Sequence, residues 1–548
     1  MKRTIILLAT FMLAGSYAKA QNSVFTKVKE INPNGDSLPG KFIQQGDKLV
    51  FTANDGNIGE ELWVTDGTEA GTKLIKDINE GENSSYPDYF VSFNGKTFFT
   101  ADDGINGNEL WITDGTTEGT QLLKDMNPGS NGSYAFEFFP FNNKLYFKAD
   151  DGEHGTELWV TDGTADGTEM VIDLREGSWG GNPSGFTVMN NEMYFSASDG
   201  IHGFELFATD GTASGTRLVK DIFANDIESS NPANLTVFEN KIYFSATDGV
   251  HGAELWVSDG TDAGTHMVKD LNPGDINSLP ANLMVVNDKL IFSCYVNGFG
   301  REFWTTDGTE AGTQILKDVK AGAGDSVIPQ FRSIVYNGKL LLTLDDGDHG
   351  AEIWTTDGTP DGTQLYLDIF PGIDSSMNPV QAPMTFYELD GYLYMRALND
   401  YQEYYQLWRT DGTQEGTVKL MPNPDAPYNF ALVQIPYFSS LGHDLIFRAQ
   451  YDEGGIELWK VSPEDLAVAD AKTEAVKIYP NPVNDVVNIS GKTKISNVSI
   501  YDLSGKQVLS QKKNSENVQL NLSSLKTGVY ILKTTSEDKT ETTKIIKK

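Results

Sequence analysis

Apolar and polar residues alternate in short runs along most of the chain, and turn-forming residues separate the runs. One representative stretch contains four such runs, at residues 89–93, 96–101, 108–113 and 121–126. Alternation with a period of two is typical of half-buried β-strands, whereas no window shows sustained helical spacing. Asn94-Gly95, between the first two runs, is a tight-hairpin signal. The pattern therefore predicts an all-β protein built from units of four short antiparallel strands.

The same unit occurs nine times along the chain. Each unit contains a Glu-Leu-Trp element or a close variant, and the elements start at positions 61, 109, 157, 205, 254, 302, 352, 406 and 457. A period of this length is typical of propeller blades or solenoid coils. The ninth unit has three strands, over about 432–462, and residues 25–32 have fourth-strand character. We therefore predict a large β-propeller of about nine four-stranded blades over residues 21–465, closed by the N-terminal strand. An open superhelix of the same units is the alternative.

Eight of the elements continue into a second shared motif. It reads Thr or Ser, then Asp-Gly-Thr, two variable residues and Gly-Thr, as in residues 65–72. This pattern resembles the ELWxxDGT repeat family of bacterial surface proteins. The motif itself predicts a turn in which Asp accepts backbone N–H groups and Gly takes a positive φ. The aromatic residue of each Glu-Leu-Trp element is predicted to pack between neighbouring blades, with stacking against a sugar as the alternative.

The N-terminal residues have the composition of a secretory signal peptide. Lys2 and Arg3 precede an apolar run from Ile5 to Leu13, and Ala18-Lys19-Ala20 is a small-x-small cleavage site. Residues 1–20 are therefore predicted to direct Sec export. The run is too short to cross a bilayer, and no other stretch approaches the roughly 20 apolar residues of a membrane helix. Cys294 is the only cysteine, so the exported chain has no internal disulfide.

Charge is distributed unevenly along the chain. Residues 471–548 hold 13 Lys and 7 Asp or Glu, a net charge of +6, so residues 1–470 carry −41 of the total of −35. This split indicates two domains of different character. The acidic part argues against binding to nucleic acid and favours cations, neutral glycans or basic surfaces as partners. The alternative is that the acidity only keeps an exported protein soluble.

The last part of the chain resembles a known export signal. A linker at 466–473 precedes residues 474–548, whose alternating runs at 486–489 and 529–533 predict a small β-sandwich. Four segments, at 477–482, 498–506, 522–530 and 544–548, resemble the type A sorting domain of cargo of the type IX secretion system. The resemblance rests on these residues: Tyr479, Pro480, Asn481, Pro482, Asp502, Gly505, Gly528 and Tyr530. It implies the type IX machinery as a partner, passage across the outer membrane, and removal of the domain during release or attachment to lipopolysaccharide. The protein is then secreted or held at the outer cell surface.

Candidate ligands lie in the loops between the second and third strands. Six units read Asp-Gly-x-x-Gly-x-Glu there, and the candidate ligands come from the five at 103–109, 151–157, 199–205, 248–254 and 346–352. Four of the six histidines occupy one equivalent position in these loops. Propeller topology places these loops on one face together with the connections between blades. Their oxygen atoms suit Ca²⁺, and a plain structural turn is the alternative. The predicted calcium residues are Asp103, Glu109, Asp151, Glu157, Asp199, Glu205, Asp248, Glu254, Asp346 and Glu352. Zinc is disfavoured because loops on adjacent blades are too far apart to share one ion, so the histidines are predicted to cap the turn or contact the next blade.

A tyrosine cluster distinguishes the corresponding loop of the eighth unit. Tyr401, Tyr404 and Tyr405 are predicted to form a patch for a glycan or protein ligand, and ordinary surface variation is the alternative. No catalytic residue is assigned, since the chain lacks Gly-x-Ser-x-Gly, His-Glu-x-x-His, a phosphate loop and a cysteine nucleophile. We therefore predict an exported binding or adhesion protein. The many carboxylates leave open an extracellular carbohydrate-active enzyme, and a purely structural surface protein is the third possibility.

Overall fold

The computed structural model describes residues 21–22, 24–224, 228–329, 331–369, 384–397, 405–421, 437–462, 476–479, 483–502, 506–526, 528–536 and 539–548. Every regular element within these ranges is a β-strand, so the predicted all-β class is confirmed for them. None of the described segments is a helix that could cross a membrane. The chain divides into two compact units, and the strands β1 to β37 belong to the first and β38 to β42 to the second.

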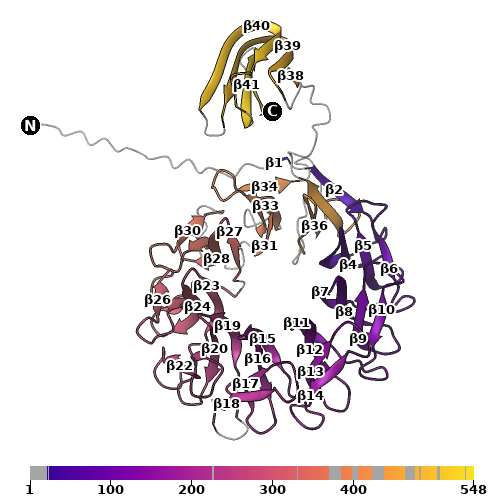
Figure 1. Cartoon of the computed structure of the whole chain (residues 1–548), viewed down its shortest axis with the longest axis vertical. Coiled ribbons are helices and arrows are strands. Elements are labelled where there is room, and N and C mark those ends of the chain that lie inside the picture. The colour runs from indigo at the N-terminus through magenta and orange to yellow at the C-terminus, as the bar shows by residue number, and fades with distance from the viewer. Residues whose placement is uncertain are drawn as a thin grey trace, which may run out of the picture. The chain divides into compact units, whose positions relative to one another are not determined.

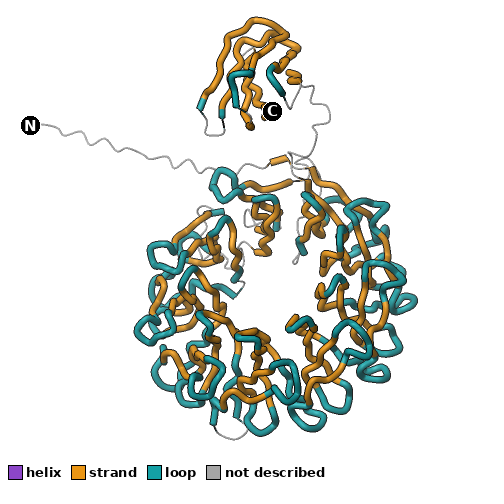
Figure 2. Tube along the Cα trace, in the orientation of Figure 1, coloured by secondary structure: helices purple, strands orange, loops and turns teal. Residues whose placement is uncertain are grey.

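The first unit consists of β-sheets that follow one another around a common centre (Figures 1 and 2). Its described part contains nine sheets, called blades 1 to 9 here, and blades 1 to 7 each consist of four consecutive antiparallel strands. Blades 1 to 7 comprise, in order, β3 (Gly40–Gln45), β4 (Lys48–Asn54), β5 (Glu60–Thr65) and β6 (Lys73–Lys76); β7 (Asp88–Phe93), β8 (Lys96–Asp102), β9 (Asn108–Thr113) and β10 (Gln121–Lys124); β11 (Phe136–Phe141), β12 (Lys144–Asp150), β13 (Thr156–Thr161) and β14 (Glu169–Ile172); β15 (Ser184–Met189), β16 (Glu192–Ser198), β17 (Phe204–Thr209) and β18 (Arg217–Lys220); β19 (Ala233–Phe238), β20 (Lys241–Thr247), β21 (Ala253–Ser258) and β22 (His266–Lys269); β23 (Ala281–Val286), β24 (Lys289–Val296), β25 (Gly300–Thr306) and β26 (Gln314–Lys317); β27 (Ser333–Tyr336), β28 (Lys339–Asp345), β29 (Ala351–Thr356) and β30 (Gln364–Leu367). The first strand of a blade lies toward the centre and the fourth at the rim (Figure 1).

Blades 8 and 9 each receive a strand from the N-terminal end of the chain. Blade 8 contains β31 (Met384–Leu389), β32 (Tyr392–Ala397), β33 (Gln406–Thr410) and β34 (Val418–Met421), and β1 (Gln21–Asn22) pairs parallel with β34. Blade 9 contains β35 (Ser439–Leu441), β36 (Asp444–Ala449) and β37 (Glu457–Ser462). The strand β2 (Val24–Lys29) pairs antiparallel with β37. It therefore occupies the fourth-strand position that the sequence predicted for residues 25–32.

Apolar side chains from neighbouring blades form the cores between them. In the core between blades 1 and 2, Trp111 packs with Leu62 and Ile75, so the aromatic residue of one blade lies against the preceding blade. The aromatic residues of all nine Glu-Leu-Trp elements are at most 7% exposed, which removes them from contact with any ligand. The predicted packing role is therefore confirmed. Each such side chain stabilises the fold by about 1.5–3 kcal/mol or more.

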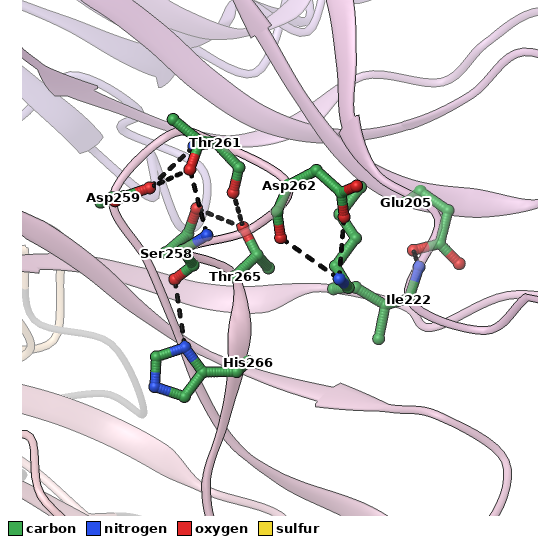
Figure 3. A network of polar contacts seen from close by, with 10 residues as sticks. Glu205, Ile222, Ser258, Asp259, Thr261, Asp262, Thr265 and His266 are labelled. Atoms are coloured by element: carbon green, nitrogen blue, oxygen red, sulfur yellow. Dashed lines mark hydrogen bonds and ion pairs between the residues drawn. The ribbon is translucent and has the colours of Figure 1, made fainter.

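The Asp-Gly-Thr motif forms the turn between the third and fourth strands, as predicted. In blade 1, Asp66 Oδ1 accepts hydrogen bonds from the Thr68 N–H at 2.9 Å and from its hydroxyl at 2.6 Å. A Cβ on Gly71 would lie 2.0 Å from the same oxygen, so only glycine fits there. Figure 3 shows the equivalent turn of blade 5, in which Asp259 accepts from Thr261. The motif's polar atoms are used within the turn, which makes the motif structural.

The central strands carry a recurring irregularity. In β7 the pairing with β8 shifts register between Asp88 and Val91, and Tyr89 within this β-bulge has a φ of +53°. The register shift recurs at the start of β3, β11, β15, β19, β23 and β31. A bulge interrupts the hydrogen-bonding edge that each first strand would otherwise present toward the centre, which disfavours pairing with another chain.

The second unit is a small sheet with its own core. It comprises β38 (Val476–Tyr479), β39 (Val486–Tyr501), β40 (Gln507–Asn521), β41 (Gly528–Ser536) and β42 (Lys539–Lys547). Hydrogen bonds connect all five described strands, because the long β39 pairs with β38 near its start, with β41 near its end and with β40 along most of its length. Val487, Val498 and Leu532 are fully buried members of a cluster formed only by side chains of this unit.

Candidate functional site

One face of the first unit is formed by two kinds of segment, and we call it the connector face. These segments are the loops between the second and third strands of each blade and the connectors from the fourth strand of one blade to the first strand of the next. Loop and connector are hydrogen-bonded: the Glu60 N–H donates to Ser84 Oγ at 2.8 Å, and the Ala253 N–H donates to Asn277 Oδ1 at 2.7 Å. The predicted grouping of these segments on one face is therefore confirmed.

A buried glutamate fastens each connector that follows blades 1 to 6. Glu61, the first residue of its Glu-Leu-Trp element, accepts from the Ile78 N–H at 2.8 Å, from the Ser85 N–H at 2.8 Å and from the Ser85 hydroxyl at 2.6 Å. Ile78 follows the last strand of blade 1 and Ser85 precedes the first strand of blade 2. The carboxylate thus holds both ends of the connector, and Figure 3 shows the corresponding contact between Glu205 and Ile222. The same arrangement is found at Glu109, Glu157, Glu205, Glu254 and Glu302.

Burial makes these carboxyl groups weak acids. Although their hydrogen bonds act in the opposite direction, desolvation raises the pKa to about 7 in four of them: Glu61, Glu157, Glu254 and Glu302. Desolvation also raises the pKa of Glu109, Glu205 and Glu457. The connector face is therefore held by groups that change protonation within the pH range of natural environments.

The free energy of unfolding of the first unit is expected to rise when the pH falls from about 8 to about 5. A glutamate with a raised folded pKa stabilises the fold fully below its unfolded value of 4.5, and this stabilisation is lost as the pH rises through about 7. Urea unfolding at several pH values, followed by tryptophan fluorescence, measures the slope.

Replacement of these four glutamates by Gln is expected to reduce that slope. Gln406 occupies the equivalent position in blade 8 and is buried, so the side chain fits. Part of the slope is expected to persist, because His154, His202, His251 and His349 also have raised pKa values. If the four substitutions leave the pH dependence of the free energy of unfolding unchanged, the buried glutamates are not its source.

The histidines of the loops cap their own turns, as predicted. Asp151 Oδ1 accepts from the backbone N–H of His154 at 2.8 Å, and its Oδ2 lies 2.7 Å from His154 Nδ1. Equivalent pairs are His202 with Asp199, His251 with Asp248 and His349 with Asp346. In blade 2 Asn106 takes the place of histidine and donates to Asp103 Oδ2 at 2.8 Å. The carboxylate partner raises the pKa of each of these four histidines.

The predicted calcium residues belong to two different sets of hydrogen bonds. The aspartates, at 103, 151, 199, 248 and 346, accept backbone N–H groups within their own loops. The glutamates, at 109, 157, 205, 254 and 352, hold the connectors. Within the described ranges no group of three or more His, Cys, Asp or Glu side chains is arranged to hold a metal ion. The calcium site stays a prediction.

The connector face also collects exposed apolar side chains. Among the described residues of the first unit, fifteen large hydrophobic side chains are exposed, and ten of them lie in the loops and connectors of this face. These ten are Leu38, Tyr86, Ile105, Tyr134, Trp179, Ile201, Val250, Ile276, Leu279 and Phe299. The other five lie within strands, so none lies in the described turns of the opposite face. Ile105 and Trp179 are 73% and 76% exposed. These residues are not among those predicted from the sequence, although an apolar residue inside an Asp-Gly-x-x-Gly turn, as at Ile105, is a usable signal.

The structure describes one residue of the predicted tyrosine patch. Tyr401 and Tyr404 lie outside the described residues. Tyr405 is half-buried against the core between blades 8 and 9, and the Arg396 guanidinium lies 3.9 Å from the centre of its ring. Its aromatic face is therefore already occupied by a cation from its own blade.

The predicted sorting residues lie at strand ends of the second unit. Pro480, Asn481, Pro482 and Gly505 are outside the described residues. Tyr479 ends β38 and is exposed, and Gly528 begins β41. Asp502 follows β39, where its Oδ1 accepts from the Lys506 N–H at 3.0 Å. The Tyr530 hydroxyl donates to the Lys526 carbonyl at 2.9 Å.

Comparison with known proteins identifies the second unit. Residues 477–548 match the family model of the secretion system C-terminal sorting domain. No curated protein matches the sequence of the chain. The chain therefore carries a type IX sorting domain, which indicates interaction with the type IX secretion machinery and export to the cell surface or the outside of the cell.

Similar solved structures cover most of the chain at low identity. PorZ of Porphyromonas gingivalis, an essential bacterial surface component of the type IX secretion system, is 13% identical over 93% of this chain and 75% of its own, with a TM-score of 0.29. An uncharacterised protein of Listeria monocytogenes is 10% identical over 75% of this chain and 99% of its own, with a TM-score of 0.32. Pyrococcus horikoshii acylaminoacyl peptidase is 12% identical over 65% of this chain and 57% of its own, with a TM-score of 0.29.

Proposed function

We propose that the chain is an exported binding protein whose first unit, a closed nine-bladed propeller, presents the connector face to an extracellular protein or glycan. Residues 1–20 act as the Sec signal peptide, and the type IX machinery then carries the protein across the outer membrane. Removal of the sorting domain leaves the propeller secreted or attached to the outer cell surface, as an ELWxxDGT-repeat surface protein.

Contacts between blades 9 and 1 support a closed ring. Val28 of β2 and Ile31 pack with Leu49 and Phe51 of blade 1 in a core that also contains Leu458 of β37. This core corresponds to those between the other neighbouring blades, such as the one that joins blade 1 to blade 2. An open array would instead end in exposed, atypical repeats.

Polar contacts at the same junction repeat those of the other blades. Glu457 accepts from the backbone N–H groups of Ile31 and Asn32 at 2.9 and 3.1 Å and from the Ser37 hydroxyl at 2.6 Å. Lys29 donates to the Thr72 carbonyl of blade 1 at 2.9 Å, just as Lys76 of blade 1 donates to the Thr120 carbonyl of blade 2. The N-terminal segment thus makes the contacts of an ordinary fourth strand and connector.

The concentration of exposed apolar side chains on one face carries the binding proposal. Exposed apolar side chains that gather on one face favour contact with a partner there. The side chains on this face come from several blades, including Ile105 of blade 2, Ile201 of blade 4 and Val250 of blade 5. The net charge of −41 over residues 1–470 favours a partner with a neutral or basic surface.

Substitution of three of these side chains by Ser is expected to weaken binding. The variant combines Ile105→Ser, Ile201→Ser and Val250→Ser, which are exposed and therefore little needed for folding. Retention of residues 21–548 on arrays of extracellular proteins and glycans is expected to fall by about tenfold, because fewer than about a third of interface side chains cost more than about 1 kcal/mol when truncated, so the three substitutions together cost about 1.4 kcal/mol.

The matched control substitutes exposed valines of the central strands. It combines Val188→Ser, Val285→Ser and Val335→Ser, and its retention is expected to equal that of the unchanged chain. Equal retention of both variants, or no retention of the unchanged chain, contradicts the proposal. Repeating the assay with a chelator tests the predicted calcium dependence, and release of sugar from the glycan array would favour the carbohydrate-active alternative.

A further inference from the structure

A pocket lies on the central strands of three consecutive blades, close to the points where the connectors enter these strands. It has a volume of about 360 Å³ and is lined by residues of β11, β15 and β19, the first strands of blades 3, 4 and 5. Figure 1 shows these three strands next to one another on the inner side of the array. Pockets that bind small ligands span about 300–1,000 Å³, so this one suits a ligand of one or two small rings.

The pocket lies where one blade lacks a side chain. Gly185 occupies the bulge position of β15 with a φ of +71°. The equivalent residues of other blades have φ values between +51° and +60° although they carry side chains: Lys41, Tyr89, Glu137, Asn234, Asn282 and Thr385. A Cβ on Gly185 would meet only Leu235 Cδ1, at an ordinary 3.8 Å. The neighbours therefore leave room for a side chain, as at the six equivalent positions, and the effect of glycine is to open space between Glu137 and Asn234.

The floor of the pocket is aromatic and held in place from behind. The ring centres of Phe139 and Phe186, on neighbouring blades, are 6.0 Å apart. Phe186 packs on the fully buried Phe195, with ring centres 5.7 Å apart, whereas the Phe138 ring packs on Phe147 in the core between blades 2 and 3. The two rings of the floor, Phe139 and Phe186, are half-buried. The pocket thus offers fixed aromatic surface to a ligand.

Two polar groups flank Gly185. Glu137 accepts from Lys148 Nζ at 3.1 Å, and the ammonium group lies 4.2 Å from the centre of the Phe136 ring. The Asn234 amide donates to the Pro280 carbonyl at 3.3 Å, which fixes its orientation. The charge of the carboxylate is compensated by a lysine that is itself only 8% exposed. The rim is therefore polar but close to neutral.

We propose that this pocket binds an uncharged pyranose unit of a glycan. A pyranose ring has an apolar C–H face, which packs on the phenylalanine floor, and hydroxyl groups, which exchange hydrogen bonds with Glu137 and Asn234. An anionic ligand is disfavoured by the acidic chain, and a cationic one finds Glu137 already paired. The site uses side chains other than the exposed apolar ones of the connector face, so the two sites can be tested separately.

The test uses residues 21–548 and an array of uncharged, sulfated and amino di- and trisaccharides. The unchanged chain is expected to bind a subset of the uncharged members. Gly185→Asn, which places at this position the residue found at Asn234 and Asn282, is expected to lower binding at least tenfold. Glu137→Gln keeps the shape of the rim and is expected to lower binding several-fold. Asn282→Gly, the matched change at the same position of blade 6, is expected to leave binding unchanged.

Several outcomes would overturn the assignment. These are the absence of binding to any uncharged member, equal binding by the unchanged chain and Gly185→Asn, or stronger retention on charged members. The melting temperature of each variant is measured alongside. If Gly185→Asn lowers the melting temperature, the sugar binding of Glu137→Gln is compared with that of Asn282→Gly instead. Equal binding by these two variants would then overturn the assignment. Failure here leaves the connector-face experiment unaffected, because that experiment uses substitutions at other residues.

Discussion

Val28→Asp is expected to prevent stable folding of the first unit, whereas Thr26→Asp, two residues earlier on the same strand, is expected to be tolerated. Val28 is buried between blades 9 and 1, and Thr26 is exposed. The substitution forfeits about 1.5–3 kcal/mol of apolar burial and adds the cost of an unpaired buried carboxylate, roughly several kcal/mol. The free energy of unfolding of a domain is only about 5–15 kcal/mol, so the stability lost by this substitution is comparable with the total.

The pair of variants separates the two architectures. In a closed ring the N-terminal strand joins the last blade to the first, so Val28→Asp opens the ring and exposes the strand edges of β37. In an open array the same change affects only one terminal repeat. Thermal unfolding and size-exclusion chromatography measure the effect. Melting temperatures for Val28→Asp and Thr26→Asp within a few degrees of each other would speak against closure.

The strands and turns could be predicted from the sequence because each depends on local chemistry. The runs predicted at 96–101 and 108–113 correspond to β8 (Lys96–Asp102) and β9 (Asn108–Thr113). Alternation sets which side chains face the neighbouring blade, and Gly-containing turns set where strands end. The fourth-strand character of residues 25–32 was also visible, because it repeats the pattern of the segment around Ile75.

The functional surfaces were less accessible to sequence reasoning. Asp103 begins a glycine-containing turn and Glu109 follows it, and an acidic residue at either place can be a calcium ligand or a hydrogen-bond acceptor for the backbone. The sequence does not distinguish these roles, because they differ only in which donors approach the carboxylate. The left-handed backbone of Tyr89 and Thr385 is equally hidden, since neither residue type favours it. The significance of Gly185 depends on comparing one bulge position across all blades in space.

Deletion of residues 477–548 is expected to abolish export while leaving the first unit folded. The second unit has its own buried core, which includes Val487, Val498 and Leu532. No side chain of the first unit belongs to that described core, so its removal creates no cavity in the blades of the first unit. In a bacterium with a type IX secretion system, the shortened chain is expected to accumulate in the periplasm, and the surface and medium fractions are expected to fall to background.

Two further measurements distinguish lost sorting from lost folding. The shortened chain is expected to melt at the same temperature as the first unit of the full chain, because the sorting domain and the blades are separate folded units. Residues 466–548 fused behind a periplasmic carrier protein are expected to bring the carrier to the outer surface, which shows that the domain suffices. Normal export of the shortened chain, or a carrier that stays in the periplasm, would mean that the type IX machinery reads a feature of the blades instead.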